Sequence, residues 1–382
     1  HSTTQQSRTQ GAALPPWTGV QGFRAGEFMK LAFVTDIHIH EPRLDEQLPV
    51  LKQTASEITA FQPDAVLIGG DLAGFRVPHR ATPVERNSLV DFFVKLAEVA
   101  PVIICRGNHD YPGDWDFLNH IKSKCYVRYS TICEEIALNP LASVVVLPWL
   151  DRSVVGGESW AEGVRTEYGK ILSQSGFAAR FALSHLAVHG SSVKAGQPTV
   201  PTADPVIPAS VFANATACFF GHYHEPQAIS GLRDARYGGS LMQNEFGESS
   251  NRGWWSWQDG VAKHHVISGV ERVVAEIDGS RLDDDTTVST AGHLKIVIKA
   301  TPETLEAAKA KADVVASKSG ARSVEIELRV DRPSRTRDGA VEVSAARTTA
   351  DKIKEYATRL EPLPDANTLL RSLELLSNLE QD

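Results

Sequence analysis

Short apolar runs alternate with helical patterns along the chain from residue 30 to about residue 268. Six of these runs have the length of a strand: KLAFVTD, DAVLIGGD, PVIICRG, ASVVVLP, RFALSHL and TACFFGH. Runs that are apolar throughout are typical of strands buried on both faces, and most of these lead directly into Gly, Asp or His. The pattern predicts an α/β core in which buried strands deliver polar residues to loops at their ends.

Two helices and a hairpin are predicted around these strands. The first helix has one apolar face, formed by Leu44, Leu48, Leu51, Ala55 and Ile58. In the second helix Thr82 is placed to cap the N-terminus, Pro83 takes the first helical position and Glu85 completes a capping box. Its buried stripe consists of Leu89, Phe92, Phe93 and Leu96. The segment WWSWQDGVAKHHV predicts a hairpin that turns at Asp259-Gly260.

A smaller unit follows the acidic segment at residues 283–285. HLKIVIKA and SVEIELRV alternate as strands on either side of a helix that opens at Thr301-Pro302, so this region predicts one β-α-β unit. The apolar positions of that helix are Leu305, Ala308, Ala312 and Val315. Two short amphipathic helices are predicted near the C-terminus, with apolar stripes at Ile353, Tyr356 and Leu360, and at Leu369, Leu373, Leu376 and Leu379.

Four regions are therefore expected: a flexible extension at 1–28, the main α/β domain at 29–285, a cap domain at 286–333, and a linker with the terminal helices at 334–382. The chain contains 42% hydrophobic and 23% charged residues, which is typical of globular proteins. It has no apolar run near the ~18–20 residues of a membrane helix, and residues 1–28 lack the apolar stretch of a secretory signal. Four cysteines without a CxxC pair suit a reducing compartment, so we expect a cytoplasmic protein.

The net charge of −8 counts against simple electrostatic binding of DNA, because Lys and Arg normally make the phosphate contacts. Acidic metal ligands contribute to this negative charge, and bound cations or a partner subunit restore a positive surface locally. The charge therefore does not exclude a nucleic-acid substrate.

Metal-capable side chains are concentrated in five segments, each at the end of a predicted strand. The segments are TDIHIH with Asp36 and His38, GGDL with Asp71, GNHD with Asn108 and His109, LSHL with His185, and GHYH with His222 and His224. Each segment alone is weak evidence for a metal site, since a single histidine at a strand end is more often a structural residue than a ligand. Five such segments in one chain, three of them with Gly directly before the ligand positions, favour a metal centre.

The residue types indicate the chemistry of this centre. Oxygen and imidazole donors without thiolate suit Mn²⁺, Fe²⁺ or Zn²⁺ better than a structural zinc site. A carboxylate such as that of Asp71 can bridge two ions ~3.5–4 Å apart, which is the separation used in two-metal hydrolysis. His109 directly follows Asn108, which suits a proton donor or a donor to the phosphate better than a ligand.

These motifs resemble those of the calcineurin-like metallophosphoesterases, over roughly residues 30–225. Within that group the chain looks like the SbcD branch of DNA-repair nucleases, which are bacterial and phage relatives of the MRE nuclease subunit. The branch resemblance rests on LPWL at 147–150, on GHYHEPQ followed by YGGSLMQNEFGE, and on the layout of the cap and terminal helices. It implies a two-sheet α/β sandwich with a di-metal site at one edge.

The resemblance also implies a role for each motif residue. One metal would be bound by Asp36, His38, Asp71 and His224, and the other by Asp71, Asn108, His185 and His222. Two divalent ions are expected, manganese before iron, zinc or magnesium, with His109 as the catalytic histidine. Archaeal and eukaryotic relatives carry a second active-site histidine three residues after the bridging Asp. Here that position is Gly74, and His79 is only a distant candidate to replace it.

The expected function is a Mn-dependent DNA exonuclease or endonuclease, acting as a subunit of an SbcC-SbcD-like repair and recombination complex. The expected partners are DNA, a second copy of the chain, and an SbcC-like coiled-coil ABC-type ATPase bound through the terminal helices, with no membrane. One alternative is a small-molecule phosphodiesterase or phosphatase of the same superfamily. Another is a non-catalytic scaffold that kept the fold. The terminal helices could also pack on the cap domain of their own chain.

Other residues near the motifs receive plainer interpretations. The remaining histidines are taken as surface or core residues: His40, His79, His120, His189, His264, His265 and His293. Trp254, Trp255 and Trp257 could stack on bases, but a core role is favoured. Solvated surface charge is the default for the arginines that flank the motif loops, which are Arg76, Arg80, Arg86, Arg106 and Arg128.

Overall fold

The computed structural model describes residues 29–74, 80–173, 176–194, 197–198, 204–282 and 285–330. The predicted extension at 1–28, the terminal helices, Arg76 and His79 lie outside these ranges. Among the described residues, no helix combines the length and the apolar composition needed to cross a membrane.

One six-stranded sheet contains the first three predicted strands. Its strands are β1 (Lys30–Val34), β2 (Ala65–Ile68), β3 (Val102–Cys105), β4 (Val127–Ser130), β15 (Gly253–Gln258) and β16 (Val261–Val266). They lie in the order β16-β15-β1-β2-β3-β4, with β1 to β4 parallel and β15 antiparallel to β1. The β15–β16 hairpin is confirmed, and its turn residues Asp259 and Gly260 both have positive φ, as a type I′ turn requires.

The other six-stranded sheet contains the remaining three predicted strands. Its strands are β5 (Glu134–Asn139), β6 (Ala142–Leu147), β7 (Ala179–His185), β12 (Ala217–Gly221), β13 (Gln227–Ala228) and β14 (Ala235–Tyr237). They lie in the order β13-β14-β12-β7-β6-β5, with antiparallel strands only at the two edges. The predicted α/β class with two multistranded sheets is therefore confirmed.

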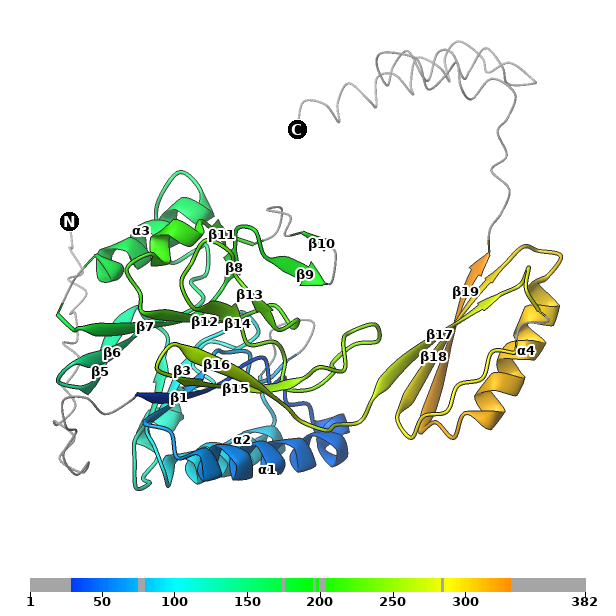
Figure 1. Cartoon of the computed structure of the whole chain (residues 1–382), viewed down its shortest axis with the longest axis horizontal. Coiled ribbons are helices and arrows are strands. Elements are labelled where there is room, and N and C mark those ends of the chain that lie inside the picture. Colours follow the sequence, from blue (N-terminus) through cyan, green and yellow to red (C-terminus); the bar gives the residue numbers. More distant parts are fainter. Residues whose placement is uncertain are drawn as a thin grey trace, which may run out of the picture. The chain divides into compact units, whose positions relative to one another are not determined.

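The helices lie on the outer faces of the two sheets. They are α1 (Leu44–Phe61) and α2 (Pro83–Ala97) on the first sheet, and α3 (Trp160–Leu172) on the second (Figure 1). Apolar side chains fill three layers, one between the sheets and one under each group of helices. The middle layer includes Phe33 and Phe219, whose ring centroids are 5.3 Å apart. Because both faces of the central strands are covered, these strands are apolar throughout.

Short elements connect the larger ones. These are the 3₁₀ helices η1 (Glu41–Arg43), η2 (Asp116–His120) and η3 (Ala209–Phe212), and the strands β8 (Ala187–Val188), β9 (Ser192–Lys194), β10 (Gln197–Pro198) and β11 (Val206–Ile207).

The two predicted helices form, and one of their predicted faces is shifted. The capping box of α2 is present, and its predicted apolar stripe is buried. In α1 the predicted face was wrong in part, since the side chain of Leu48 is 43% exposed. The buried face consists of Glu46, Gln47, Val50, Leu51, Thr54, Ala55 and Ile58. Gln47 is buried because its amide accepts from the backbone N–H of His40 (2.8 Å) and donates to the carbonyl of His38 (2.9 Å).

A three-stranded sheet with one helix forms near the end of the described chain. Its order is β17 (Arg272–Asp278), β18 (His293–Ala300) and β19 (Ser323–Val330), with α4 (Leu305–Lys318) between the last two strands in sequence. The predicted β-α-β unit is confirmed. Strand β17 was not predicted, and it lies before residue 286, the expected start of the cap domain. The chain divides into two compact units, and the second contains Glu276–Thr287 and Ile296–Ser317.

The cysteines and tryptophans lie mainly in the apolar layers. All four cysteines are free, and Cys105 and Cys218 are buried in apolar layers. Trp254 and Trp257 are also buried, which supports their core role.

Candidate metal centre

The five motif segments lie at the carboxyl ends of β1, β2, β3, β7 and β12, where parallel strands of both sheets end together. Backbone hydrogen bonds join the first two loops, from Asp36 N to the Gly70 carbonyl (3.1 Å) and from His38 N to the Asp71 carbonyl (3.0 Å). Four of the motif residues have φ between 49° and 100°, a region that non-glycine residues rarely adopt: Asp36, His38, Asp71 and His222. Such local strain is typical of functional sites, where surrounding contacts hold it in place.

Glycine is required where these loops approach most closely. A Cβ on Gly107 would overlap the carboxylate of Asp71, and a Cβ on Gly221 would overlap the carbonyl of Gly69. Glycine at these two positions therefore allows the loops to approach each other closely.

The first group of donor atoms lies between Asp36, His38 and His224, whose ligand atoms are all within 4.8 Å of one another. The Nε2 atom of His38 is 3.9 Å from Asp36 Oδ1 and 3.0 Å from His224 Nε2. Asp71 lies beside this group, with its Oδ2 atom 3.7 Å from the same nitrogen of His38. The structure thus brings together the four residues predicted for one metal.

Hydrogen bonds on the far sides of the two imidazoles determine which of their nitrogens carry lone pairs. The Nδ1 atom of His38 bonds the carbonyl of Gly74, and the Nδ1 atom of His224 bonds Glu248 Oε1 at 2.7 Å. A carbonyl and a carboxylate can only accept, so both Nδ1 atoms carry hydrogen. Both Nε2 atoms then present lone pairs to each other at 3.0 Å, an arrangement that a proton or a cation between them would stabilise.

The pKa values of the two imidazoles in this group shift in opposite directions. Burial lowers the pKa of His38 to about 4, so its imidazole is neutral at pH 7. Burial is the largest single effect on His224 and acts against its charge, but the hydrogen bond to Glu248 and the charges of Asp36, Glu248 and Asp71 together raise the pKa of that imidazole. Burial acts against charge on Glu248, but the hydrogen bond to His224, the nearby charges of His224 and Arg252 and the backbone N–H of Asn244 together lower its pKa to about 2.

The second group of donor atoms surrounds the Asn108 side chain. Its Oδ1 atom lies 2.8 Å from His185 Nε2 and 3.0 Å from His222 Nδ1. The far nitrogens again face acceptors, with His185 Nδ1 2.6 Å from the Gly69 carbonyl and His222 Nε2 3.1 Å from Asp204 Oδ2. Lone pairs on an oxygen and two nitrogens therefore converge, as the ligands of a divalent cation do.

Asp71 contacts both groups of donor atoms. Its Oδ2 atom is 3.3 Å from His185 Nε2, and its Oδ1 atom accepts from the backbone N–H of His109 at 2.9 Å. Burial acts against charge on this pair, yet their mutual attraction holds the pKa of Asp71 well below its usual range and raises the pKa of His185 to about 9. The bridging role of Asp71 stays a prediction, and its position is the one that role requires.

The Asp36 carboxylate lies close to both groups of donor atoms, whereas it was predicted for only one metal. It belongs to the first group and also lies within 4.8 Å of the ligand atoms of Asp71 and His185. Its oxygens accept from Thr35 Oγ1 at 2.6 Å and from the backbone N–H of His222. The carboxylate therefore joins the loops that carry the two groups.

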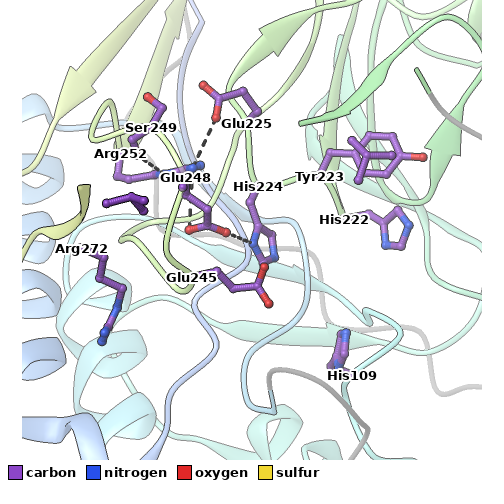
Figure 2. A pocket seen from close by; sticks show the side chains of 13 residues that line it. His109, His222, Tyr223, His224, Glu225, Glu245, Glu248, Ser249, Arg252 and Arg272 are labelled. Atoms are coloured by element: carbon purple, nitrogen blue, oxygen red, sulfur yellow. Dashed lines mark hydrogen bonds and ion pairs between the residues drawn. The ribbon is translucent and has the colours of Figure 1, made fainter. Parts of the chain in front are cut away.

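His109 lies beside the donor atoms without taking part in either group. Its ring is 5.3 Å from that of His38, and it lines a cavity of about 470 Å³ together with His222 and His224 (Figure 2). Within the described part of the chain, its buried Nδ1 atom has no hydrogen-bond partner. This position suits a group that donates to a substrate in the cavity, as predicted for a catalytic histidine.

Three acidic residues that were not predicted, Asp110, Asp204 and Glu248, hold the centre together. Asp110 accepts from the backbone N–H groups of Gly107 (2.8 Å), Leu72 (2.8 Å) and Asp71 (3.1 Å). Burial and the charge of Asp71 raise its pKa to about 6. The fourth letter of GNHD could have indicated Asp110, and the FGE segment could have indicated Glu248. Asp204 had no sequence signal.

Gly74 stands where archaeal and eukaryotic relatives have a second active-site histidine, and it contributes only backbone atoms to the site. Gly74 has a φ of 76°, and its carbonyl holds His38. The candidate replacement, His79, lies outside the described residues.

The flanking arginines differ in their surroundings, and Arg80 is exposed, as expected. Arg106 is only 7% exposed and donates to the Trp149 carbonyl at 3.1 Å. Arg86 pairs with Asp114, and Arg128 pairs with Glu134. Solvated charge was therefore the wrong interpretation for Arg106, because its guanidinium fixes the loop before GNHD to the LPWL segment.

Comparison with known proteins agrees with this geometry. Residues 29–226, more than half of the chain, match the family described as calcineurin-like phosphoesterase. The chain belongs to this family of metallophosphoesterases, which are hydrolases that bind two divalent metals, and the donor atoms described above fit such a pair of ions.

Two solved structures are similar at low identity. One is GAP50 of Plasmodium, the anchor in the inner membrane complex, with 13% identity, 64% of this chain and 88% of that chain covered, and a TM-score of 0.43. The other is a dimetal phosphatase from Danio rerio, with 14% identity, coverage of 60% and 91%, and a TM-score of 0.37. Similarities at this level do not distinguish one activity from another.

Replacing Asp71 with Asn should remove or weaken one of two bound Mn²⁺ ions. A neutral amide leaves two facing cations poorly screened, so the loss should at least match the ~10–100-fold that follows from losing a ligand's hydrogen-bond partner. Isothermal titration with Mn²⁺ measures it. Asp64→Asn, just before β2 at its other end, is the matched control and should keep both ions. Two tight sites in Asp71→Asn would show that Asp71 does not bridge.

Proposed function

We propose that this metallophosphoesterase is a DNA nuclease, which cuts phosphodiester bonds with two divalent cations, manganese first among them. The observation that carries the hydrolytic part is the position of His109, which lines the cavity beside both groups of donor atoms. The choice of DNA is supported by the resemblance of LPWL and of the segment ending in FGE to the SbcD branch.

The residues of the chain divide the chemistry among them. Divalent cations held by the two groups would supply Lewis-acid stabilisation of the phosphate oxygens and a nucleophile at neutral pH. Asp71 and Asp36 hold the two groups at a short, constant separation. His109 donates a hydrogen bond or proton toward the leaving oxygen from within the cavity. Buried backbone contacts of Asp110 keep the His109 loop in register with Asp71.

Digestion of labelled single- and double-stranded DNA tests the proposal directly. We expect cleavage with Mn²⁺ and none with EDTA. His109→Ala should lose ~10²–10⁴-fold of the rate, the usual contribution of a general acid, while it retains two bound Mn²⁺ ions by elemental analysis.

The matched control for His109→Ala is His120→Ala, because His120 is exposed at the end of η2 and should tolerate the change with normal cleavage. Full activity of His109→Ala, or loss of both ions, would contradict the assigned role. Hydrolysis of a small nucleotide phosphodiester without cleavage of DNA would instead favour the small-molecule phosphodiesterase.

We also propose that the terminal helices dock on a coiled-coil ATPase, as in an SbcC-SbcD-like complex. Helices of this length are marginal alone in water, so their leucine stripes need a partner surface. Removing residues 350–382 should leave Mn²⁺ binding and single-strand cleavage intact and abolish co-purification with the ATPase. If the shortened chain unfolds or aggregates, the helices pack on their own chain and this proposal fails.

A further inference from the structure

The segment that follows the last metal motif folds back onto it. Residue Glu248 of this segment has a side chain only 5% exposed, and its Oε1 atom bonds His224 Nδ1 at 2.7 Å (Figure 2). Its Oε2 atom accepts from the backbone N–H of Asn244 at 2.7 Å. The Glu248 carboxylate thus accepts two hydrogen bonds, one from His224 in the metal motif and one from Asn244 in its own loop.

The loop that carries Glu248 is itself held firmly. Gln243 Nε2 donates to the backbone carbonyl of Glu248 at 2.7 Å. The buried guanidinium of Arg252 lies 3.7 Å from Glu248 Oε2, donates to the carbonyl of Ser249 at 2.8 Å, and reaches Glu225 Oε2 at 3.3 Å. Because Glu225 directly follows His224, Arg252 ties both ends of this loop together.

The other group of donor atoms has its own carboxylate–histidine pair. Asp204 Oδ2 lies 3.1 Å from His222 Nε2, and the Asp204 side chain is 36% exposed. The remaining two site histidines, His38 and His185, are backed by the carbonyls of Gly74 and Gly69. Each group therefore contains one histidine backed by a carbonyl and one backed by a carboxylate.

We propose that Glu248 is a positioning residue for the first cation, because it holds the His224 imidazole with its proton on Nδ1 and its lone pair toward His38. Asp204 has the same relation to His222 and so acts on the second cation. A carboxylate behind a ligating imidazole fixes the tautomer and raises the basicity of the ligand. This inference rests on the metal-dependent part of the proposed function and not on DNA as the substrate.

Glutamine is the informative replacement for Glu248, since it preserves shape but has only one oxygen. That oxygen can accept from His224 or from Asn244, and the amide then faces the other donor. In Glu248→Gln we expect one of two Mn²⁺ binding steps to weaken ~10–100-fold in isothermal titration, with the other step unchanged. Asp204→Asn should weaken the other step, and the double variant should weaken both.

The tautomer gives a readout that is independent of metal and of activity. In EDTA, the ¹⁵N shifts of His224 should report a protonated Nδ1 in the wild type and a mixture of tautomers in Glu248→Gln, with the His224 signals assigned from a His224→Gln spectrum. Glu135→Gln is the matched control, because the Glu135 carboxylate also accepts from two donors, Ser143 and Arg180, on the second sheet. It should leave both Mn²⁺ steps and the His224 shifts unchanged.

Two results would overturn the proposal. One is unchanged Mn²⁺ binding and unchanged His224 shifts in Glu248→Gln. The other is equal weakening of both steps together with a lower melting temperature in EDTA, which would assign Glu248 to the stability of the fold. Absence of DNA cleavage by the wild type, with these titrations as expected, would contradict the nuclease proposal and leave this inference intact.

Discussion

The site depends on one constraint, which is that ring nitrogens and side-chain oxygens face one another with their lone pairs across a short gap. Each of the four site histidines has its outer nitrogen on an acceptor, which is a carbonyl for His38 and His185 and a carboxylate for His222 and His224. The inner nitrogens therefore cannot satisfy each other. The Asp36 and Asp71 carboxylates add negative charge to the same space, and the neutral Asn108 oxygen adds a further lone pair. Burying such groups without positive charge between them costs free energy of folding. Divalent cations would supply that positive charge, and they would also supply the hydrolytic chemistry.

The fold explains how so many acceptors can be brought together. Parallel strands from two sheets end at the same place, and their apolar side chains fill layers on both faces. That packing can hold motif residues in backbone conformations that other positions would not tolerate. Asp110 contributes in the same way, since its carboxylate binds backbone N–H groups from the second and third motif loops. The stability of the two packed sheets therefore keeps the motif side chains in their positions at the site.

The sequence predicts much of this because the determinants are local. An apolar run followed by Asp or His is visible in a strand such as KLAFVTD, and so is the Thr82 capping box. Residues whose role comes from distant contacts are missed. Gln47 lies on the buried face of α1 because it bonds the loop after β1, and Glu248 and Asp204 matter because the fold brings them to histidines. Strand β17 was missed because it lies before the expected boundary of the cap domain.

We expect this site to hold two divalent cations on either side of Asp71. Anomalous diffraction from crystals soaked in Mn²⁺ would locate them. Two peaks should lie ~3.5–4 Å apart, the separation of two-metal hydrolases, with Asp71 between them. One peak should lie beside His38 and His224, and the other beside Asn108, His185 and His222. A single peak, or two peaks that do not share Asp71, would contradict this expectation.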